Sequence, residues 1–215
     1  FLSSMKRLNV ASPSLLVRVT QHIPSIISTI EQIINNGYAY EAKGSVYFDV
    51  EKYDKAFGYT SLVPNLENEE PHEEIRERQE KKSHRDFALW KSFSAKNGDE
   101  TIGWASPWGN GVPGWHIECS SMIKHVFGDH LGVHAGGIDL AFPHHANEIA
   151  QFLASLPMEE GEKVGKRTEG EESRRWPEIF VHVGHLEING KKMAKSLKNF
   201  TSVDDFLAGE GKEKG

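Results

Sequence analysis

The sequence has 215 residues, of which 38% are hydrophobic and 26% are charged, and its formal net charge is −6. This composition is typical of a globular protein and excludes a collagen-like or wholly disordered chain. No apolar run reaches the length of a bilayer-spanning helix, and no secretory signal is visible, so we expect no membrane partner. The negative charge argues against tight, non-specific binding of nucleic acid by the whole surface.

The chain ends and the cysteine count give two further expectations. The one cysteine, Cys119, rules out an intrachain disulfide and suits a reducing compartment. The sequence begins with Phe1 within an apolar pattern rather than with methionine. We therefore interpret it as an internal piece of a longer protein.

The first third of the chain predicts a helix and then a hairpin. Apolar residues recur at helical spacing over residues 14–35, with Pro24 opening the main helix and Asn36-Gly37 as its stop. Two short aromatic and β-branched runs then flank Lys43-Gly44, which favours a β-hairpin over residues 38–50. Residues 51–66 are expected to form loop with a short helical turn.

The middle of the chain alternates charged and ordered segments. Residues 67–82 are nearly all charged or polar, which favours a solvated helix or a mobile linker. Residues 86–91 predict a short strand or turn, and the Gly-, Pro- and Trp-rich residues 102–117 predict a functional loop. A helix is expected over residues 117–127.

The last third of the chain begins with a predicted buried strand at residues 131–140, followed by a helix from Pro143 to about residue 156. The charged, glycine-containing residues 158–175 predict a disordered insertion.

A strand, a second hairpin and a basic loop are expected at residues 180–183, 186–190 and 191–196. A final helix begins at Ser202, with Asp205 at the capping-box position.

One group of residues has the chemistry of a zinc site. A thiolate, an imidazole and a carboxylate are all zinc donors, and the sequence offers Cys119, His144 and Glu148. A helix would place His144 and Glu148 on one face, one turn apart. On spacing alone, a buried cysteine and a capping histidine explain these residues at least as well, and His145 competes with His144 as the ligand.

Two other segments suggest a nucleotide site. The glycines of residues 134–139 would let a ligand approach the backbone, and Asp139 could accept hydrogen bonds from a ribose, although a plain strand-to-helix turn fits equally well. Four lysines lie in residues 191–198, where ammonium groups on a mobile loop could close over a polyphosphate. A solvated basic turn is the alternative. Trp115, close to Cys119, would wall the same pocket as a metal there.

Taken together, these segments resemble the class I cysteinyl-tRNA synthetases. The resemblance rests on residues 114–122, 134–140, 142–151 and 192–196. Residues 1–50, 86–91 and 106–109 also resemble the family, so the similarity covers most of the chain and spares the two charged runs and the tail.

The resemblance implies a zinc ion that binds the thiolate of the substrate cysteine. Its ligands match Cys119, His144 and Glu148, and the family's fourth ligand, a cysteine, lies upstream of Phe1, so weakened zinc affinity is expected. Trp115 and His134 match residues of the amino-acid pocket. A thiolate binds zinc well and a serine hydroxyl does not, which explains selectivity without editing.

The resemblance also implies an ATP site. Gly136 and Asp139 match positions expected near ATP, which enters with Mg²⁺ as a substrate. Lys192 and Lys195 match the lysines of the KMSKS signature, to which we assign catalytic roles, and Lys195 is expected to contact the ATP phosphates during adenylate formation.

The implied fold is α/β, a partial Rossmann-like class I catalytic domain with a connective insertion. A parallel sheet flanked by helices is expected in residues 103–157 and 176–205. The predicted segments are a helical lead (1–36), the connective insertion (37–102), the second catalytic half with the zinc residues (103–157), the disordered insertion (158–175) and the KMSKS-type loop with the start of a helix (176–215).

The implied activity is the cytoplasmic, ATP-dependent ligation of L-cysteine to tRNA(Cys) by the longer protein. The isolated chain is expected to be inactive, because the HIGH signature and the anticodon-binding region lie outside it. Two alternatives are a cysteine ligase that makes a small thiol and a non-catalytic zinc- or RNA-binding module derived from the fold.

Overall fold

The computed structural model describes residues 1–59, 62, 79–93, 103–157 and 176–209. It divides into two compact units, one of residues 18–182 and the other of residues 1–17 and 183–215. The predicted insertion at 158–175 and most of the charged run 67–82 lie outside the described residues. The five-part division expected from the sequence stays a prediction.

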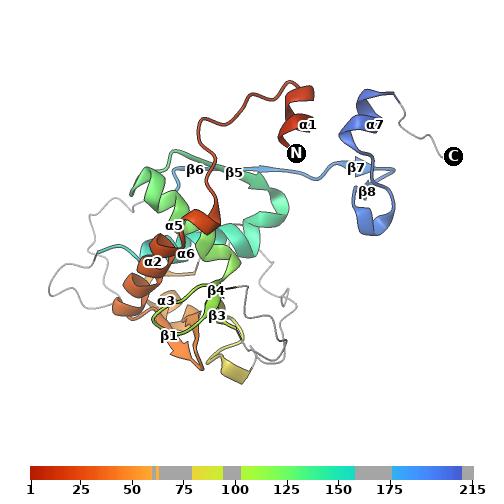
Figure 1. The fold of residues 1–215 in the computed structure, drawn as a ribbon. Coiled ribbons are helices and arrows are strands. Elements are labelled where there is room, and N and C mark those ends of the chain that lie inside the picture. Colours follow the sequence, from red (N-terminus) through yellow and green to blue (C-terminus); the bar gives the residue numbers. More distant parts are fainter. Residues whose placement is uncertain (60–61, 63–78, 94–102, 158–175, 210–215) are drawn as a thin grey trace. The chain divides into compact units, whose positions relative to one another are not determined.

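The larger unit is built around helix α2, Ile23–Asn35, which follows a 3₁₀ turn at Val19–Gln21 (Figure 1). Pro24 stands in its first turn and Gly37, with φ of 79°, follows its end, as predicted. The helix does not reach back to residue 14, because a proline in the first turn has no N–H to donate to a preceding turn. Its buried residues are Thr29 and four isoleucines, Ile23, Ile26, Ile30 and Ile33.

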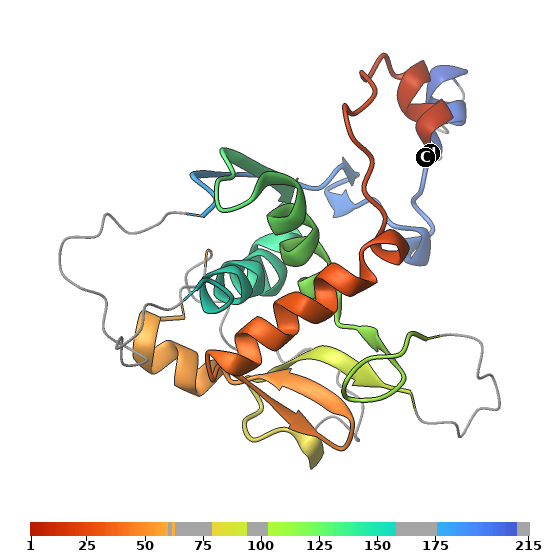
Figure 2. The same cartoon turned by 60° about the vertical axis from the view of Figure 1, so that its left-hand side comes forward.

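A four-stranded antiparallel sheet packs beside this helix, in the order β1-β2-β3-β4 (Figure 2). Its strands are β1 Ala39–Ala42, β2 Ser45–Phe48, β3 Phe87–Ser92 and β4 Gly111–Pro113. The predicted hairpin is confirmed, and Lys43 and Gly44 both have positive φ, as a tight two-residue turn requires. The strand expected at residues 86–91 is also confirmed.

Two local expectations are corrected in this unit. Residues 51–66 were expected to be loop with a helical turn, but α3 spans Val50–Phe57, capped by Asp49, which accepts from the N–H of Lys52. Glu80, in the run expected to be solvated, is buried and accepts a 2.9 Å hydrogen bond from the hydroxyl of Tyr47. An acidic residue that is paired in this way can leave the solvated surface.

Helices α5, Trp115–Phe127, and α6, Ala146–Ala154, pack on each other and on α2. Helix α5 begins two residues earlier than expected. Helix α6 begins later, because a separate wide turn at Ala141–His145 contains Phe142 in an extended conformation. The N–H of Gly114 donates to the carbonyl of Leu89, at 2.8 Å, so the sheet fixes the start of α5.

Strands β5 Val133–Gly137 and β6 Ile179–Val183 form a second, two-stranded sheet. The N–H groups of Glu178 and Ile179 donate to the carbonyls of Leu131 and Gly132, just before β5 begins. The parallel sheet expected here stays a prediction. The expected burial is wrong, since alternate residues of both strands are exposed and Val133 is 56% exposed. Within the described part of residues 18–182, no element covers that face.

The smaller unit contains α1 Leu2–Arg7, strands β7 Glu187–Ile188 and β8 Lys191–Lys192, a 3₁₀ turn at Lys195–Leu197 and α7 Val203–Leu207. The second hairpin is confirmed, and the side chains of Ser202 and Asp205 form the expected capping box. Arg7 of α1 pairs with Asp204 of α7. No helix in the described part of the chain combines the length and apolar character needed to span a bilayer.

Candidate metal centre

The three residues predicted to bind zinc lie together in the larger unit. Cys119 comes from α5, His144 from the turn that precedes α6, and Glu148 from the first turn of α6. Their ligand atoms all lie within 4.8 Å of one another. His144 and Glu148 are buried, and Cys119 is partly buried. Because α5 packs on α6, Cys119 lies next to His144 and Glu148 although it is distant from them in sequence.

The surroundings of the Glu148 carboxylate indicate whether a cation fits among the three ligand atoms. His144 Nε2 lies 3.0 Å from Glu148 Oε1, yet this oxygen is fully buried and receives no well-aligned hydrogen bond from the residues that the structure describes. A buried carboxylate oxygen without a donor is costly, and such atoms are rare unless an ion or water satisfies them. The surrounding donors are one sulfur, one imidazole nitrogen and one carboxylate oxygen, a set that suits Zn²⁺.

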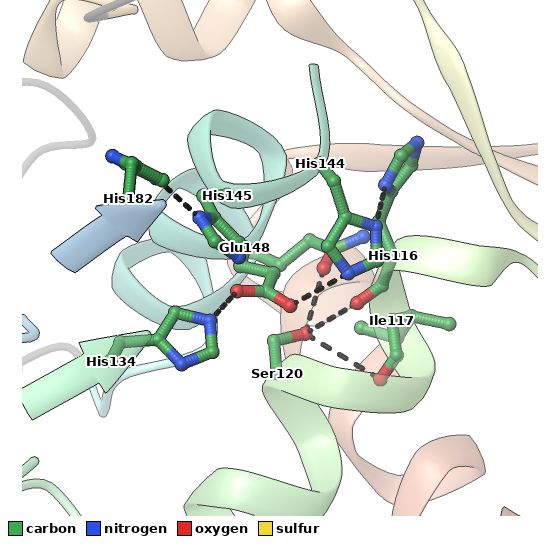
Figure 3. Close-up of polar contacts among 9 residues, drawn as sticks. His116, Ile117, Ser120, His134, His144, His145, Glu148 and His182 are labelled. Carbon is green, nitrogen blue, oxygen red and sulfur yellow. Dashed lines mark hydrogen bonds and ion pairs between the residues drawn. The ribbon is translucent and has the colours of Figure 1, made fainter. Parts of the chain in front are cut away.

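The second oxygen of Glu148 is already satisfied. It accepts a 2.7 Å hydrogen bond from His134 Nε2 (Figure 3). His134, His145 and Glu148 form a second group whose ligand atoms lie within 4.8 Å. In that group the carboxylate oxygen is paired, and His145 Nδ1 lies 2.8 Å from His182 Nε2. The group containing Cys119 and His144 is therefore the better candidate, and His145 has a different partner.

Burial and charge shape the acid–base state of this group. Burial, followed by the charge of Glu148, raises the pKa of the Cys119 thiol to about 12. Burial alone would raise the pKa of Glu148, but the close contacts and charges of His134 and His144 lower it to about 2. The carboxylate is thus ionised and the thiol protonated at neutral pH. A bound cation would favour the thiolate.

Three further side chains near the group are those of Trp115, His116 and His182, of which only Trp115 was predicted as a site residue. Trp115 is 62% exposed, and its ring centroid lies 4.6 Å from that of His144, so it stands beside the candidate centre as expected. His116 lies deeper: its Nδ1 is 2.8 Å from His144 Nδ1, and burial, with the charge of His144, lowers its pKa to about 3. His116 follows Trp115 in sequence, but no sequence spacing indicated that it would contact His144. His182 could be found only as an inward residue of an alternating strand.

The residues predicted to contact ATP lie in two places. Gly136 is the last residue but one of β5, and a Cβ there would lie 2.8 Å from Cε1 of His145, so close packing already requires a glycine. Asp139 lies in the 3₁₀ turn Ile138–Leu140. Lys192 and Lys195 are exposed in the smaller unit, where Lys195 Nζ lies 5.3 Å from the ring centroid of Phe200. Their roles toward ATP stay predictions.

Comparison with known proteins assigns the family. Residues 1–213 match the family described as "tRNA synthetases class I (C) catalytic domain". The chain belongs to this family. The predicted resemblance is thereby confirmed, and the mixed α/β structure is consistent with part of a class I synthetase catalytic domain.

Curated relatives carry a more specific name. The chain is 44% identical over 215 residues to "Cysteine--tRNA ligase, cytoplasmic" of Dictyostelium discoideum, covering 96% of this chain and 30% of the relative. It is 44% identical to the protein of that name in Drosophila melanogaster (96% and 27%) and to "Probable cysteine--tRNA ligase, mitochondrial" of Xenopus tropicalis (96% and 32%). The chain thus spans about 30% of the length of the relatives it matches.

Proposed function

We propose that the chain serves the ATP-dependent ligation of L-cysteine to tRNA(Cys) and contributes the amino-acid-binding part of a Rossmann-like class I catalytic domain with a connective insertion. The observation that carries the proposal is the group of buried His144 and Glu148 with partly buried Cys119, in which one carboxylate oxygen has no well-aligned donor among the described residues. The names of the curated relatives support it. The cytoplasm is the proposed location, although relatives named for both the cytoplasm and the mitochondrion match.

Cys119, His144 and Glu148 would hold the zinc ion, which supplies a Lewis acid that binds the substrate thiolate. The three donors of this chain leave part of the zinc coordination open, as in zinc sites that act on a ligand. Trp115 offers an exposed ring beside His144 to wall the amino-acid pocket. His134, hydrogen-bonded to Glu148, would line the other side and contact the amino acid. A pocket of this kind favours a soft thiolate over the hydroxyl of serine.

The ATP side of the proposal rests on four residues. Gly136 and Asp139 would lie near the nucleotide, and ATP would enter with Mg²⁺. Lys192 and Lys195 would place ammonium groups against the phosphates and offset the charge that develops as the adenylate forms. Both lysines are exposed, as residues that meet a substrate must be.

The amino-acid step can be tested on this chain alone. The chain is loaded with Co²⁺, whose thiolate charge-transfer absorption reports sulfur bound to the metal, and is titrated with L-cysteine and L-serine. We expect cysteine to bind at least about 100-fold more tightly than serine. Cys119→Ser is the control and should lose most of the thiolate absorption before substrate is added. Equal responses to both amino acids would contradict the proposal.

The two alternatives, a ligase that makes a small thiol and a non-catalytic binding module, would share the metal site. The names of the relatives favour the tRNA ligase. An acceptance assay with a longer protein containing this chain separates them: cysteine attached to tRNA(Cys) supports the proposal. Cysteine transferred only to a small amine, or to nothing, supports one of the alternatives.

A further inference from the structure

His116 occupies a fixed position against one of the proposed ligands. It lies on α5, three residues before Cys119, and its Nδ1 lies 2.8 Å from His144 Nδ1 (Figure 3). The ring of His116 meets Phe87 edge-on, with centroids 5.7 Å apart, and stacks on Trp115 at the same separation. These aromatic neighbours on two sides restrict the orientation of the ring, in which Nδ1 faces His144.

The contact between the two imidazoles constrains where their protons lie. At 2.8 Å one Nδ1 must donate and the other must accept. His144 Nε2 lies 3.0 Å from Glu148 Oε1, where an Nε2–H can donate to the carboxylate in the metal-free chain, but a cation binds only through a bare lone pair on Nε2. In the cation-bound state the proton of a neutral His144 is therefore on Nδ1, and His116 Nδ1 is the acceptor. The opposite tautomer would put a proton where the cation belongs.

We propose that His116 is a positioning residue of the metal centre, whose unprotonated Nδ1 accepts from His144 Nδ1–H and thereby holds His144 in the tautomer that turns a bare Nε2 toward Cys119 and Glu148. The inference rests on the proposed function, because it presumes that these residues hold zinc. Residues that orient a metal-binding histidine in this way commonly change metal affinity 10- to 100-fold when they are removed.

Glu148 shows the same arrangement. Its Oε2 is held by His134 while Oε1 is left toward His144 and Cys119. Each of the two buried ligands therefore has one atom fixed by a histidine outside the ligand group and one atom turned toward the shared position. The two supporting histidines come from different elements, α5 and β5, so the pattern does not follow from one helix repeat.

Two amide substitutions test the role of His116 Nδ1. In His116→Asn a carbonyl oxygen is attached to Cγ, as Nδ1 is, so an acceptor stays near the His144 N–H. In His116→Gln the same amide lies one bond further out. Zn²⁺ affinity is measured by competition with a chromogenic chelator. We expect His116→Gln to weaken binding by about 10- to 100-fold and His116→Asn to stay within about 3-fold of the unchanged chain.

The outcomes separate this inference from the function on which it rests. If both variants bind Zn²⁺ like the unchanged chain, or if both lose it equally, the role of Nδ1 as acceptor is wrong. Cys119→Ser is the site control, and unchanged Zn²⁺ affinity in that variant would overturn the proposed centre itself. Near-UV circular dichroism checks that each variant is folded.

A measurement on the unchanged chain does not depend on the variants. The ¹⁵N chemical shifts of the His144 ring in the zinc-loaded chain report which nitrogen carries the proton. We expect a protonated Nδ1 and a metal-bound Nε2. A protonated Nε2, or binding of the metal through Nδ1, would overturn the inference.

Discussion

The two oxygens of Glu148 have different environments, and that difference defines the candidate centre. One accepts from His134 at 2.7 Å, and the other, also buried, lies 3.0 Å from His144 Nε2 but has no well-aligned donor in the described part of the chain. Because a buried carboxylate requires compensation, the second oxygen marks where a cation would be accommodated.

Replacing Glu148 by glutamine should therefore weaken Zn²⁺ binding by about 10-fold or more while leaving the fold intact. The substitution keeps the volume of the side chain but removes its charge, and an uncharged amide oxygen is a poorer zinc donor. Chelator competition measures the affinity, and thermal unfolding of the metal-free chain checks the fold. Undiminished affinity with an unchanged melting temperature would remove Glu148 from the ligand group.

The pH dependence of Zn²⁺ binding follows from Cys119. Its pKa is raised to about 12, so the metal-free chain carries a thiol proton throughout the accessible pH range, and binding the metal must release that proton. Glu148, with a pKa near 2, contributes no proton at neutral pH. Zn²⁺ affinity should rise by about 10-fold per pH unit between about pH 7.5 and 9.

Isothermal titration in buffers of different ionisation enthalpy counts the released protons directly. The expected count is close to one for the unchanged chain and close to zero for Cys119→Ser. A pH-independent affinity would mean that Cys119 is not bound as a thiolate.

At the residue scale, the sequence suggested the ligands but not the residues that orient them. The spacing of His144 and Glu148 indicated one helical face, and Cys119 was the one thiol available. No sequence spacing could show that His116 would face His144, because that contact depends on how α5 packs against the turn before α6.

Among the elements, those with strong local signals were predicted well. The buried isoleucines of α2, the positive-φ turn of the first hairpin and the capping box of α7 are all encoded within a few residues. Strand β4 was not predicted, because only three of its residues pair. These residues form a strand because they pair with β3, which lies far from them in sequence. Helix α3 was underestimated, although Asp49 caps it and Tyr53 is buried in the core.

The short strand β4 gives a prediction about Gly111. A Cβ at this position would lie 2.3 Å from the carbonyl oxygen of Lys91 and 2.4 Å from Nε1 of Trp90. Gly111→Ala should lower the free energy of unfolding by about 1–3 kcal/mol or more, because backbone and a buried indole must shift. Urea denaturation measures it.

Gly132→Ala is the matched control. Apart from its two chain neighbours, no atom of the described residues lies within 4 Å of a Cβ at that position, so the same added methyl group should change stability by no more than about 0.5 kcal/mol. If Gly111→Ala and Gly132→Ala are equally stable, the close packing of β4 on β3 is not as described.

On the scale of the molecule, the antiparallel sheet supports the helices that form the site. It packs beside α2, and it fixes the start of α5 through the bond from Gly114 to Leu89, which sets the positions of Trp115, His116 and Cys119 along that helix. The sequence predicted a mixed α/β chain. Residues 102–117 were expected to form a loop, but they contain β4 and the start of α5. It also expected β5 to be buried, and this expectation failed because burial depends on which neighbours cover a strand.

The central claim is that Cys119, His144 and Glu148 form a zinc centre that binds the thiolate of cysteine. X-ray absorption spectroscopy at the zinc edge of the loaded chain tests it most directly. We expect one sulfur neighbour at about 2.3 Å, from Cys119, and a second sulfur when L-cysteine is added but not when L-serine is added. Zinc without a sulfur neighbour, or a sulfur count that cysteine leaves unchanged, would contradict it.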